Sequence, residues 1–419
     1  MNKMKDIVGA RVDALEGRLL ALSHRLHANP EVAWAEVNAS AWVAAELAGV
    51  GFTVEKNLCG LPTAFAATVG SGSLHLGICA EYDALPGLGH ACGHNIIAAA
   101  AVGAAAALAP VVDALGITLT VFGTPAEEGG GGKIELLERG AFDGVHAAMM
   151  VHPGPLDVAR AEPYAVSHSK IRYRGKASHA AAYPERGVNA ADAFTVAQVA
   201  IGLLRQQLES GVRVHGVVTH GGDAPNAIPE VTEGRWYVRA GSLAELAELE
   251  EKVARCFEAG ALSTGCELQI EAESKPYAEF ATDEAMLEFY VANATALGRT
   301  FTTSGPDMRM NRASTDMGNV SQVLPAIHPY IGIDSLPAVN HQKEFAAAAI
   351  TAAADRAVVD AAKAMAHTCI DLATDAGLRA RLAGLLAERT AARLLTEAVA
   401  LPLDPSLEPP LELETADVR

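Results

Sequence analysis

Residues 73–83, which read S-L-H-L-G-I-C-A-E-Y-D, decide the fold. Their first eight residues form an apolar run that stops at Glu81-Tyr82-Asp83, and an Ala-rich stretch follows at 96–109. An apolar run of this length is typical of a buried parallel strand, and the Ala-rich stretch is typical of a buried helix. Similar runs at 117–122 and 147–151 also end where polar residues begin. This order of strand, polar motif and helix predicts a doubly wound, mostly parallel α/β sheet, with ligands at the carboxyl ends of its strands.

The pattern changes after about residue 167 and favours a second unit. Expected strands lie at 171–174 and around 212–219, 234–240 and 267–272, and expected helices at 187–208 and 243–259. This β-α-β-β-α-β order is typical of a compact α+β domain with an antiparallel sheet. We therefore expect residues 1–166 and 278–400 to form one catalytic domain, residues 167–277 an inserted lid domain, and the Pro- and acid-rich residues 401–419 a disordered tail.

Composition excludes several classes of partner. The 419 residues hold 50 acidic against 32 basic side chains, and the net charge of −18 disfavours nucleic acid and anionic membranes, which reward clustered Lys and Arg. The Ala-rich stretch is too short to span a membrane, and the charged N-terminal segment does not resemble a signal peptide. Six cysteines without C-x-x-C spacing favour a reduced, cytoplasmic setting.

Metal-ligand chemistry gathers at the predicted strand ends. Cys92 and His94, in Cys92-Gly93-His94, offer a thiolate and an imidazole, and Glu128 adds an oxygen. His152 and His341 are further imidazoles that could complete the shell. Taken singly, such a cysteine is usually a small core residue and an adjacent Glu-Glu usually a solvated helix face. Their joint placement predicts a site for one or two divalent metal ions.

Two carboxylates beside this set have different expected roles. If Glu128 binds metal, Glu127 stays free to take a proton from water and pass it to a leaving amine. Asp83 is placed to accept the second N–H of a ligating histidine, although a helix N-cap before Pro86 is the alternative.

Two other enzyme classes do not fit the sequence. Lys133 follows a run of glycines, but the next residue is Ile134, whereas a phosphate-binding loop has Ser or Thr after its Gly-Lys pair. A G-x-S-x-G nucleophile elbow is absent.

The motifs together resemble the M20 metallopeptidases, subfamily D. The resemblance runs in order through nearly the whole chain, up to about residue 401, in Glu81-Tyr82-Asp83-Ala84-Leu85-Pro86, Gly89-His90-Ala91-Cys92-Gly93-His94-Asn95, Gly123-Thr124-Pro125-Ala126-Glu127-Glu128-Gly129-Gly130, His152-Pro153-Gly154, Gly175-Lys176-Ala177-Ser178-His179-Ala180, Pro225-Asn226-Ala227-Ile228-Pro229 and Ser314-Thr315-Asp316-Met317-Gly318-Asn319-Val320. Asn95 and the Ser314-Thr315-Asp316 segment are similar to two branches, dipeptidases of the β-alanyl-lysine type and p-aminobenzoyl-glutamate hydrolase subunits.

The resemblance implies roles for the same residues and for three more. Cys92, His94, Glu128, His152 and His341 match the metal ligands of the family, and Glu127 matches its general base. The resemblance also implies that a lid domain interrupts the catalytic domain and makes the homodimer contact. His179 matches a histidine that reaches the neighbouring active site and stabilises the oxyanion. Asn226 and Arg239 match residues that hold the substrate carboxylate. Without the resemblance, these three would be a turn histidine, a turn former and an exposed strand arginine.

The sequence thus predicts a cytoplasmic, homodimeric, metal-dependent amidohydrolase for dipeptides or N-acyl amino acids that carry a free carboxylate. Zinc, manganese and cobalt all suit the donor set. The alternatives are a p-aminobenzoyl-glutamate hydrolase-type subunit, which would work in a heteromer, a non-catalytic binding protein that keeps the fold, and a metal-buffering protein.

Overall fold

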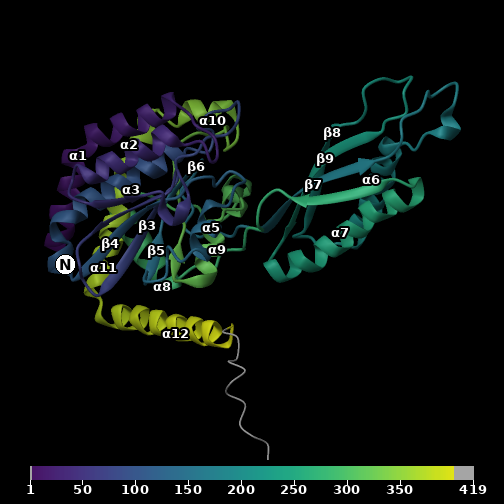
Figure 1. Cartoon of the computed structure of the whole chain (residues 1–419). Helices are drawn as coiled ribbons and strands as arrows, with labels where there is room; N and C mark the ends of the chain where they lie inside the picture. The colour runs from purple at the N-terminus through teal and green to yellow at the C-terminus, as the bar shows by residue number, and fades with distance from the viewer. Residues whose placement is uncertain (1, 401–419) are drawn as a thin grey trace, which may run out of the picture.

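A six-stranded sheet runs through the larger lobe of the computed structural model, which describes residues 2–400 (Figure 1). In spatial order its strands are β1 (Thr53–Lys56), β2 (Phe65–Val69), β4 (Ile117–Gly123), β3 (Leu74–Ala80), β5 (Ala147–Met149) and β11 (Ala326–Ile327). Only β2 runs against the others, because it pairs antiparallel with both β1 and β4. The predicted doubly wound, mostly parallel α/β fold is confirmed.

Helices cover both faces of this sheet, which explains the continuous apolar runs. One face packs against α1 (Asn2–Ala28), α2 (Val37–Ala48), α3 (His94–Leu108), α8 (Glu284–Ala296) and α11 (Ala352–Thr374). The other face packs against α5 (Gly132–Glu138) and α9 (Met317–Val323). In β4, Val121 enters the first core and Phe122 the second, so neighbouring residues are both buried.

Helix α3 is the buried helix that the Ala-rich stretch predicts, and every one of its residues is buried. It lies close to α1 and α11 because its side chains are small. A Cβ on Gly103 would stand 2.7 Å from Leu19 Cδ1 and 2.9 Å from Ala362 Cβ. The stretch His94–Leu115 is long and apolar enough to cross a membrane, but 83% of its most apolar window is buried inside the protein. This stretch is therefore a core element of the larger lobe.

The third apolar run differs from its prediction. Residues 147–151 do not form one strand that ends at His152, because β5 ends at Met149, although the Met150 and His152 N–H groups still donate to the carbonyls of Ile327 and Pro329. His152 instead begins β6 (His152–Gly154), which pairs in parallel with β12 (Tyr330–Gly332) in a separate two-stranded sheet.

The smaller lobe has its own sheet and core. Its strands lie in the order β10 (Glu267–Ala272), β7 (Ala165–Arg174), β9 (Val231–Ala240) and β8 (Arg213–His220), all antiparallel. Helices α6 (Ala190–Leu204) and α7 (Leu243–Thr264) pack on one face, around Phe194, Trp236 and Phe257. The element order matches the predicted β-α-β-β-α-β unit, while its exact boundaries stay a prediction.

The two chain crossings between the lobes lie side by side. Val166 on β7 and Tyr277, after β10, exchange both backbone hydrogen bonds, at 3.0 and 2.9 Å. The Tyr277 hydroxyl also donates to the backbone carbonyl of Glu127, at 2.7 Å. The junction of the lobes is thus tied directly to a predicted site residue.

The rest of the chain returns to the larger lobe. It contains α10 (Lys343–Ala348) and the C-terminal α12 (Ala376–Ala400), which the sequence analysis did not predict as a separate helix, whereas α4 (Val112–Leu115) lies earlier in the chain, just before β4. The expected disordered tail, 401–419, lies outside the described residues.

Candidate metal centre

The five predicted ligands reach one place from four loops. Cys92 immediately precedes α3, and His94 is its first residue. Glu128 follows β4 in a turn, and His152 begins β6. His341 lies between β12 and α10, with a φ of 68° and a backbone N–H that donates to Ala91 at 2.8 Å. The carboxyl ends of the strands therefore carry these groups.

Gly93 permits the sharp entry into α3. Its φ of 78° lies in the left-handed region, and a Cβ there would stand 2.5 Å from Pro153 Cγ. Only glycine avoids both the strain and the collision. The result is that Cys92 and His94 face the residue that precedes Pro153, which is His152.

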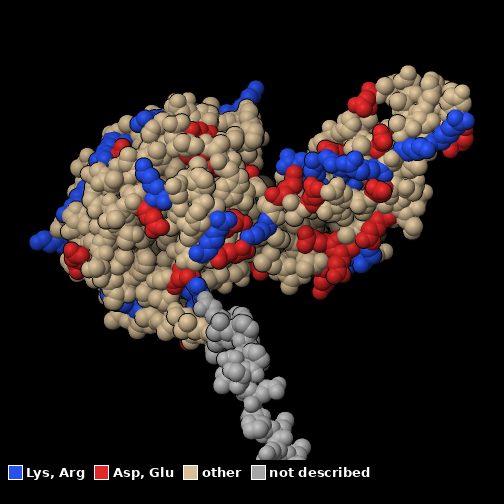
Figure 2. All heavy atoms as spheres, viewed as in Figure 1, with Lys and Arg blue, Asp and Glu red and all other residues tan. Residues whose placement is uncertain are grey.

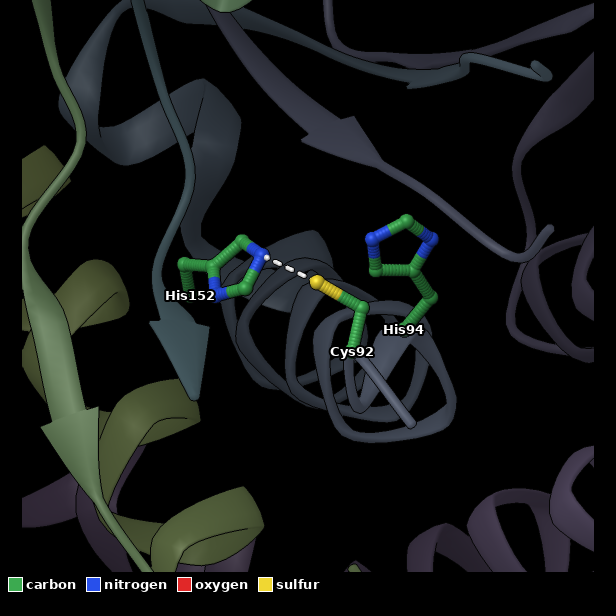
Figure 3. A group of neighbouring side chains, drawn as sticks. All are labelled: Cys92, His94 and His152. Atoms are coloured by element: carbon green, nitrogen blue, oxygen red, sulfur yellow. Dashed lines mark hydrogen bonds between the residues drawn. The ribbon is translucent and has the colours of Figure 1, made fainter. Parts of the chain in front are cut away.

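Distances within the set suit a shared cation. Cys92 Sγ lies 3.5 Å from His152 Nε2 (Figure 3). Glu128 Oε1 lies 3.4 Å from His341 Nε2 and 4.0 Å from His94 Nε2. Ligand atoms of Cys92, His94 and His152 all lie within 4.8 Å of one another, as do those of Cys92, Glu128 and His341. Cys92 belongs to both groups, so the five side chains form one continuous set.

Three atoms of this region are buried without a hydrogen-bond partner, namely Glu81 Oε2, His94 Nε2 and Glu128 Oε1. Buried polar atoms are almost always paired, so a convergence of unpaired ones is a specific signal. Burial opposes a charged thiol, yet His152 lowers the pKa of Cys92 well below its usual range. A thiolate beside unpaired imidazole and carboxylate atoms fits a bound divalent cation.

Asp83 lies behind the set and contacts two of its members. Its Oδ1 is 3.0 Å from His94 Nδ1, and its Oδ2 accepts the backbone N–H of Glu128 at 2.9 Å. An imidazole that donates through Nδ1 presents Nε2 to a metal. This is the geometry expected of a carboxylate that orients a ligand.

Glu127 is buried and stands apart from its neighbour Glu128. Its Oε2 lies 3.9 Å from His94 Nε2, and its ligand atom belongs to a third group with those of Glu81 and His94. Burial raises the pKa of Glu127 well above its usual range, and the charges of Glu81 and Glu128 raise it further. A carboxylate held in this way has a high proton affinity.

The sequence analysis missed a buried ionic network under the site. Lys133 Nζ donates to Glu81 Oε1 and Asp316 Oδ1, each at 2.6 Å, and all three side chains are fully buried. Burial disfavours the charge of Lys133, but Asp316 and Glu81 raise its pKa well above the usual value. The other oxygen of Glu81 faces His94 Nε2 at 3.4 Å. The sequence does not reveal this pairing, because Lys133 lies 52 positions from Glu81 and 183 positions from Asp316.

A cavity of about 420 Å³ adjoins the centre and reaches both lobes. Cys92, Glu127, Glu128, His152 and His341 line one end, and Arg239 of the smaller lobe lines the other. Arg239 Nη1 donates to Ser314 Oγ at 2.6 Å. The predicted substrate-binding arginine thus shares a cavity with the predicted ligands.

His179 and Asn226 do not line this cavity. They lie on two exposed loops of the smaller lobe that contact each other, with the Ala180 N–H donating to the Asn226 carbonyl at 3.0 Å. His179 Nδ1 accepts the backbone N–H of Ala182 at 3.1 Å. Within one chain, His179 and Asn226 therefore do not share a cavity with the candidate metal centre.

Comparison with known proteins gives a coherent set of relatives. A family model described as Peptidase family M20/M25/M40 matches residues 77–370. A Xaa-Arg dipeptidase of Mus musculus is 40% identical over 386 residues, which cover 88% of this chain and 89% of that protein. A p-aminobenzoyl-glutamate hydrolase polypeptide of Escherichia coli (strain K12) is 26% identical over 450 residues, covering 90% and 94%.

The fold recurs among solved structures. A dinuclear metal-binding peptidase of the M20 family from Bacillus subtilis superposes with a TM-score of 0.64 at 22% identity, covering 86% of this chain and 99% of that one. The two-lobed fold is therefore shared.

Proposed function

The chain belongs to peptidase family M20/M25/M40, and we propose that it hydrolyses dipeptides or N-acyl amino acids that carry a free carboxylate. It is a hydrolase of peptide or amide C–N bonds and depends on divalent metal. The observation that carries the proposal is that one cavity is lined by four of the five candidate ligands, by the carboxylate of Glu127 and by Arg239.

Cys92, His94, Glu128, His152 and His341 would hold one or two ions, of zinc, manganese or cobalt. A bound ion would lower the pKa of water and polarise the scissile carbonyl. The mixture of sulfur, nitrogen and oxygen donors suits these borderline metals. The unpaired atoms of His94 and Glu128 support this assignment, because a cation would satisfy both.

Glu127 would move the proton. Its carboxylate takes a proton from the attacking water and returns it to the nitrogen of the leaving amine, so that a neutral amine departs. The Tyr277 hydroxyl, which donates to the Glu127 carbonyl, fixes the backbone of this turn. Asp83 keeps the His94 ring in one orientation through Nδ1.

Arg239 would hold the substrate carboxylate. A guanidinium presents parallel N–H donors that match a carboxylate, and Arg239 has no acidic partner in the described part of the chain. Asn226 would add a second donor to the same carboxylate.

We assign His179 to the active site of a partner protomer, where it would donate to the oxyanion of the tetrahedral intermediate. Its exposed loop lies outside the cavity of its own chain, which supports a contribution in trans. In the smaller lobe, β8 is an edge strand, and Val217, Val199 and Leu203 are 58%, 59% and 71% exposed. An open strand edge beside apolar side chains favours a homodimer through this lobe. All six cysteines are free, which favours a cytoplasmic location.

The test is a hydrolysis screen with controlled metal content. The protein is stripped with a chelator, reloaded in turn with zinc, manganese and cobalt, and assayed on dipeptides, N-acyl amino acids and p-aminobenzoyl-glutamate. We expect hydrolysis to disappear on stripping and to return with at least one ion. Hydrolysis that survives stripping, or none with any ion, would contradict the proposal.

A further inference from the structure

Four arginines line the cavity beside the metal centre, and they form two pairs. Arg213 and Arg239 come from β8 and β9 of the smaller lobe. Arg309 and Arg312 come from a 3₁₀ segment, Pro306–Arg312, of the returning chain. The acidic residues of the lining are Glu127 and Glu128, which belong to the metal centre.

The first pair is held in an unfavourable arrangement. Arg213 and Arg239 stand directly opposite each other in the antiparallel register of β8 and β9. Like charges at such positions destabilise a sheet. Arg213 donates to the backbone carbonyls of Ser210 and Val212, at 2.8 and 2.7 Å, and neither arginine has a carboxylate partner among the described residues.

The second pair, Arg309 and Arg312, likewise places two positive charges side by side, here on one turn of a 3₁₀ helix. Arg309 and Arg312 are three residues apart, and side chains at that spacing eclipse in a 3₁₀ helix. Arg312 Nη1 donates to the Tyr164 hydroxyl at 3.1 Å, and Ser314 Oγ donates to the Tyr164 carbonyl at 2.7 Å. Because Ser314 also contacts Arg239, the two pairs adjoin through Tyr164 and Ser314.

Three arginines outside the cavity show the contrast. Arg172, Arg235 and Arg299 each pair with a carboxylate, and Figure 2 shows acidic and basic side chains interspersed over both lobes. Within the described chain, none of the four cavity arginines has a carboxylate oxygen within 4.0 Å, although Asp307 lies on the same turn as Arg309.

The positive charge of Arg239 contributes to a lower pKa of two nearby histidines, His168 and His215. Burial, and then Arg239 and Arg235, lower the pKa of His168 to about 4. Burial and Arg239 also lower the pKa of His215. His168 and His215 thus stay neutral and add no positive charge to the cluster.

We propose that this cluster selects substrates whose free-carboxylate residue is itself acidic, that is, dipeptides or N-acyl amino acids ending in glutamate or aspartate. The inference rests on the proposed function. With Arg239 on the α-carboxylate, Arg213, Arg309 and Arg312 receive the side-chain carboxylate. A terminal arginine would instead bring a fifth guanidinium into the cavity.

Matched substrates test this selection. With the metal-loaded protein, kcat/KM for Ala-Glu should exceed that for the isosteric Ala-Gln by about tenfold or more, since one charge-assisted contact is worth that much. The double variant Arg309→Gln/Arg312→Gln should bring the ratio toward one. Arg235→Gln is the control, because Arg235 lies on the same face of β9 but is paired with Glu273 at 2.6 Å, and it should leave the ratio unchanged. A parental ratio near one, or a preference for Ala-Arg, overturns the proposal.

Calorimetric titration with the products L-glutamate and L-glutamine separates this inference from the proposed function. Tighter binding of glutamate, weakened in the double variant, supports the selection even if no dipeptide is cleaved, in which case only the hydrolytic function fails. Equal binding of the two amino acids overturns the selection whatever the hydrolysis screen gives.

Discussion

Glu127 and Glu128 are adjacent in the chain, yet their side chains meet different groups. Glu128 Oε1 faces His341 and His94, while Glu127 Oε2 lies 3.9 Å from His94 and the Glu127 ligand atom forms a group with those of Glu81 and His94. The preceding Ala126 has a φ of 59°, and Asp83 accepts the Glu128 N–H. These backbone constraints, rather than side-chain chemistry, underlie the two different roles that we propose for two identical residues.

Lys133 provides a test at the same scale. Lys133→Met would leave Glu81 and Asp316 buried without their cation, and we expect it to lower the free energy of unfolding by about 3–5 kcal/mol. Denaturant unfolding of the metal-free protein measures the change.

The control is Lys170→Met, because Lys170 is 36% exposed and lies 3.5 Å from Glu233. An exposed pair contributes less than about 1 kcal/mol. Equal effects of the two substitutions would show that the buried network does not stabilise the fold.

At the scale of elements, the start of α3 positions two of the proposed metal ligands, Cys92 and His94. Gly93→Ala adds a methyl group 2.5 Å from Pro153 Cγ, which must move either the Cys92–His94 turn or His152. We expect the substitution to weaken metal binding by about tenfold or more, as loss of ligand orientation does elsewhere. Competition with a chromophoric chelator measures the affinity.

Gly87→Ala is the matched control. Gly87 has a similar φ of 74°, but a Cβ there would meet nothing within 4 Å. It therefore carries the same backbone strain without the collision, and metal affinity should stay near that of the parent. If both variants bind metal alike, the contact with Pro153 does not position the ligands.

Sequence patterns predicted the strands that are buried on both faces. They did not predict features that depend on contacts between residues far apart in the sequence. The runs that became β3 and β4 are continuous because two cores flank the sheet. The break after Met149 was not predictable, because it depends on the pairing of β6 with β12, nearly 180 positions away. Helix α12 was missed because its apolar positions pack only partly on the larger lobe.

The same limit applies to the candidate site. Motifs placed Cys92, His94, Glu127 and Glu128 at strand ends, where the fold brings them together. Nothing local in the sequence links Lys133 to Asp316, or Arg213 to Arg309, because a tertiary cavity or ion pair leaves no periodic pattern.

At the scale of the whole molecule, the two lobes form one cavity but leave His179 outside it. If His179 acts in a partner protomer, Glu127→Gln and His179→Ala should each be inactive alone yet complement each other. In a randomly mixed population, half the dimers are mixed, and each mixed dimer holds one intact site, so about a quarter of parental activity should return. Activity after protomer exchange measures this.

Two results would contradict a contribution in trans. One is no recovery in a mixture that light scattering and mass spectrometry show to contain mixed dimers. The other is a chain that stays monomeric and active at assay concentrations.

The most direct measurement of the central claim is metal content and turnover of Glu127→Gln, determined on the same preparation. Because the five proposed ligands remain and only the proposed proton acceptor is lost, the variant should bind metal like the parent while kcat falls by about 10²–10⁴-fold. Near-parental turnover, or a loss of turnover that follows a loss of metal, would contradict the assignment of Glu127 as an unligated base beside a metal centre.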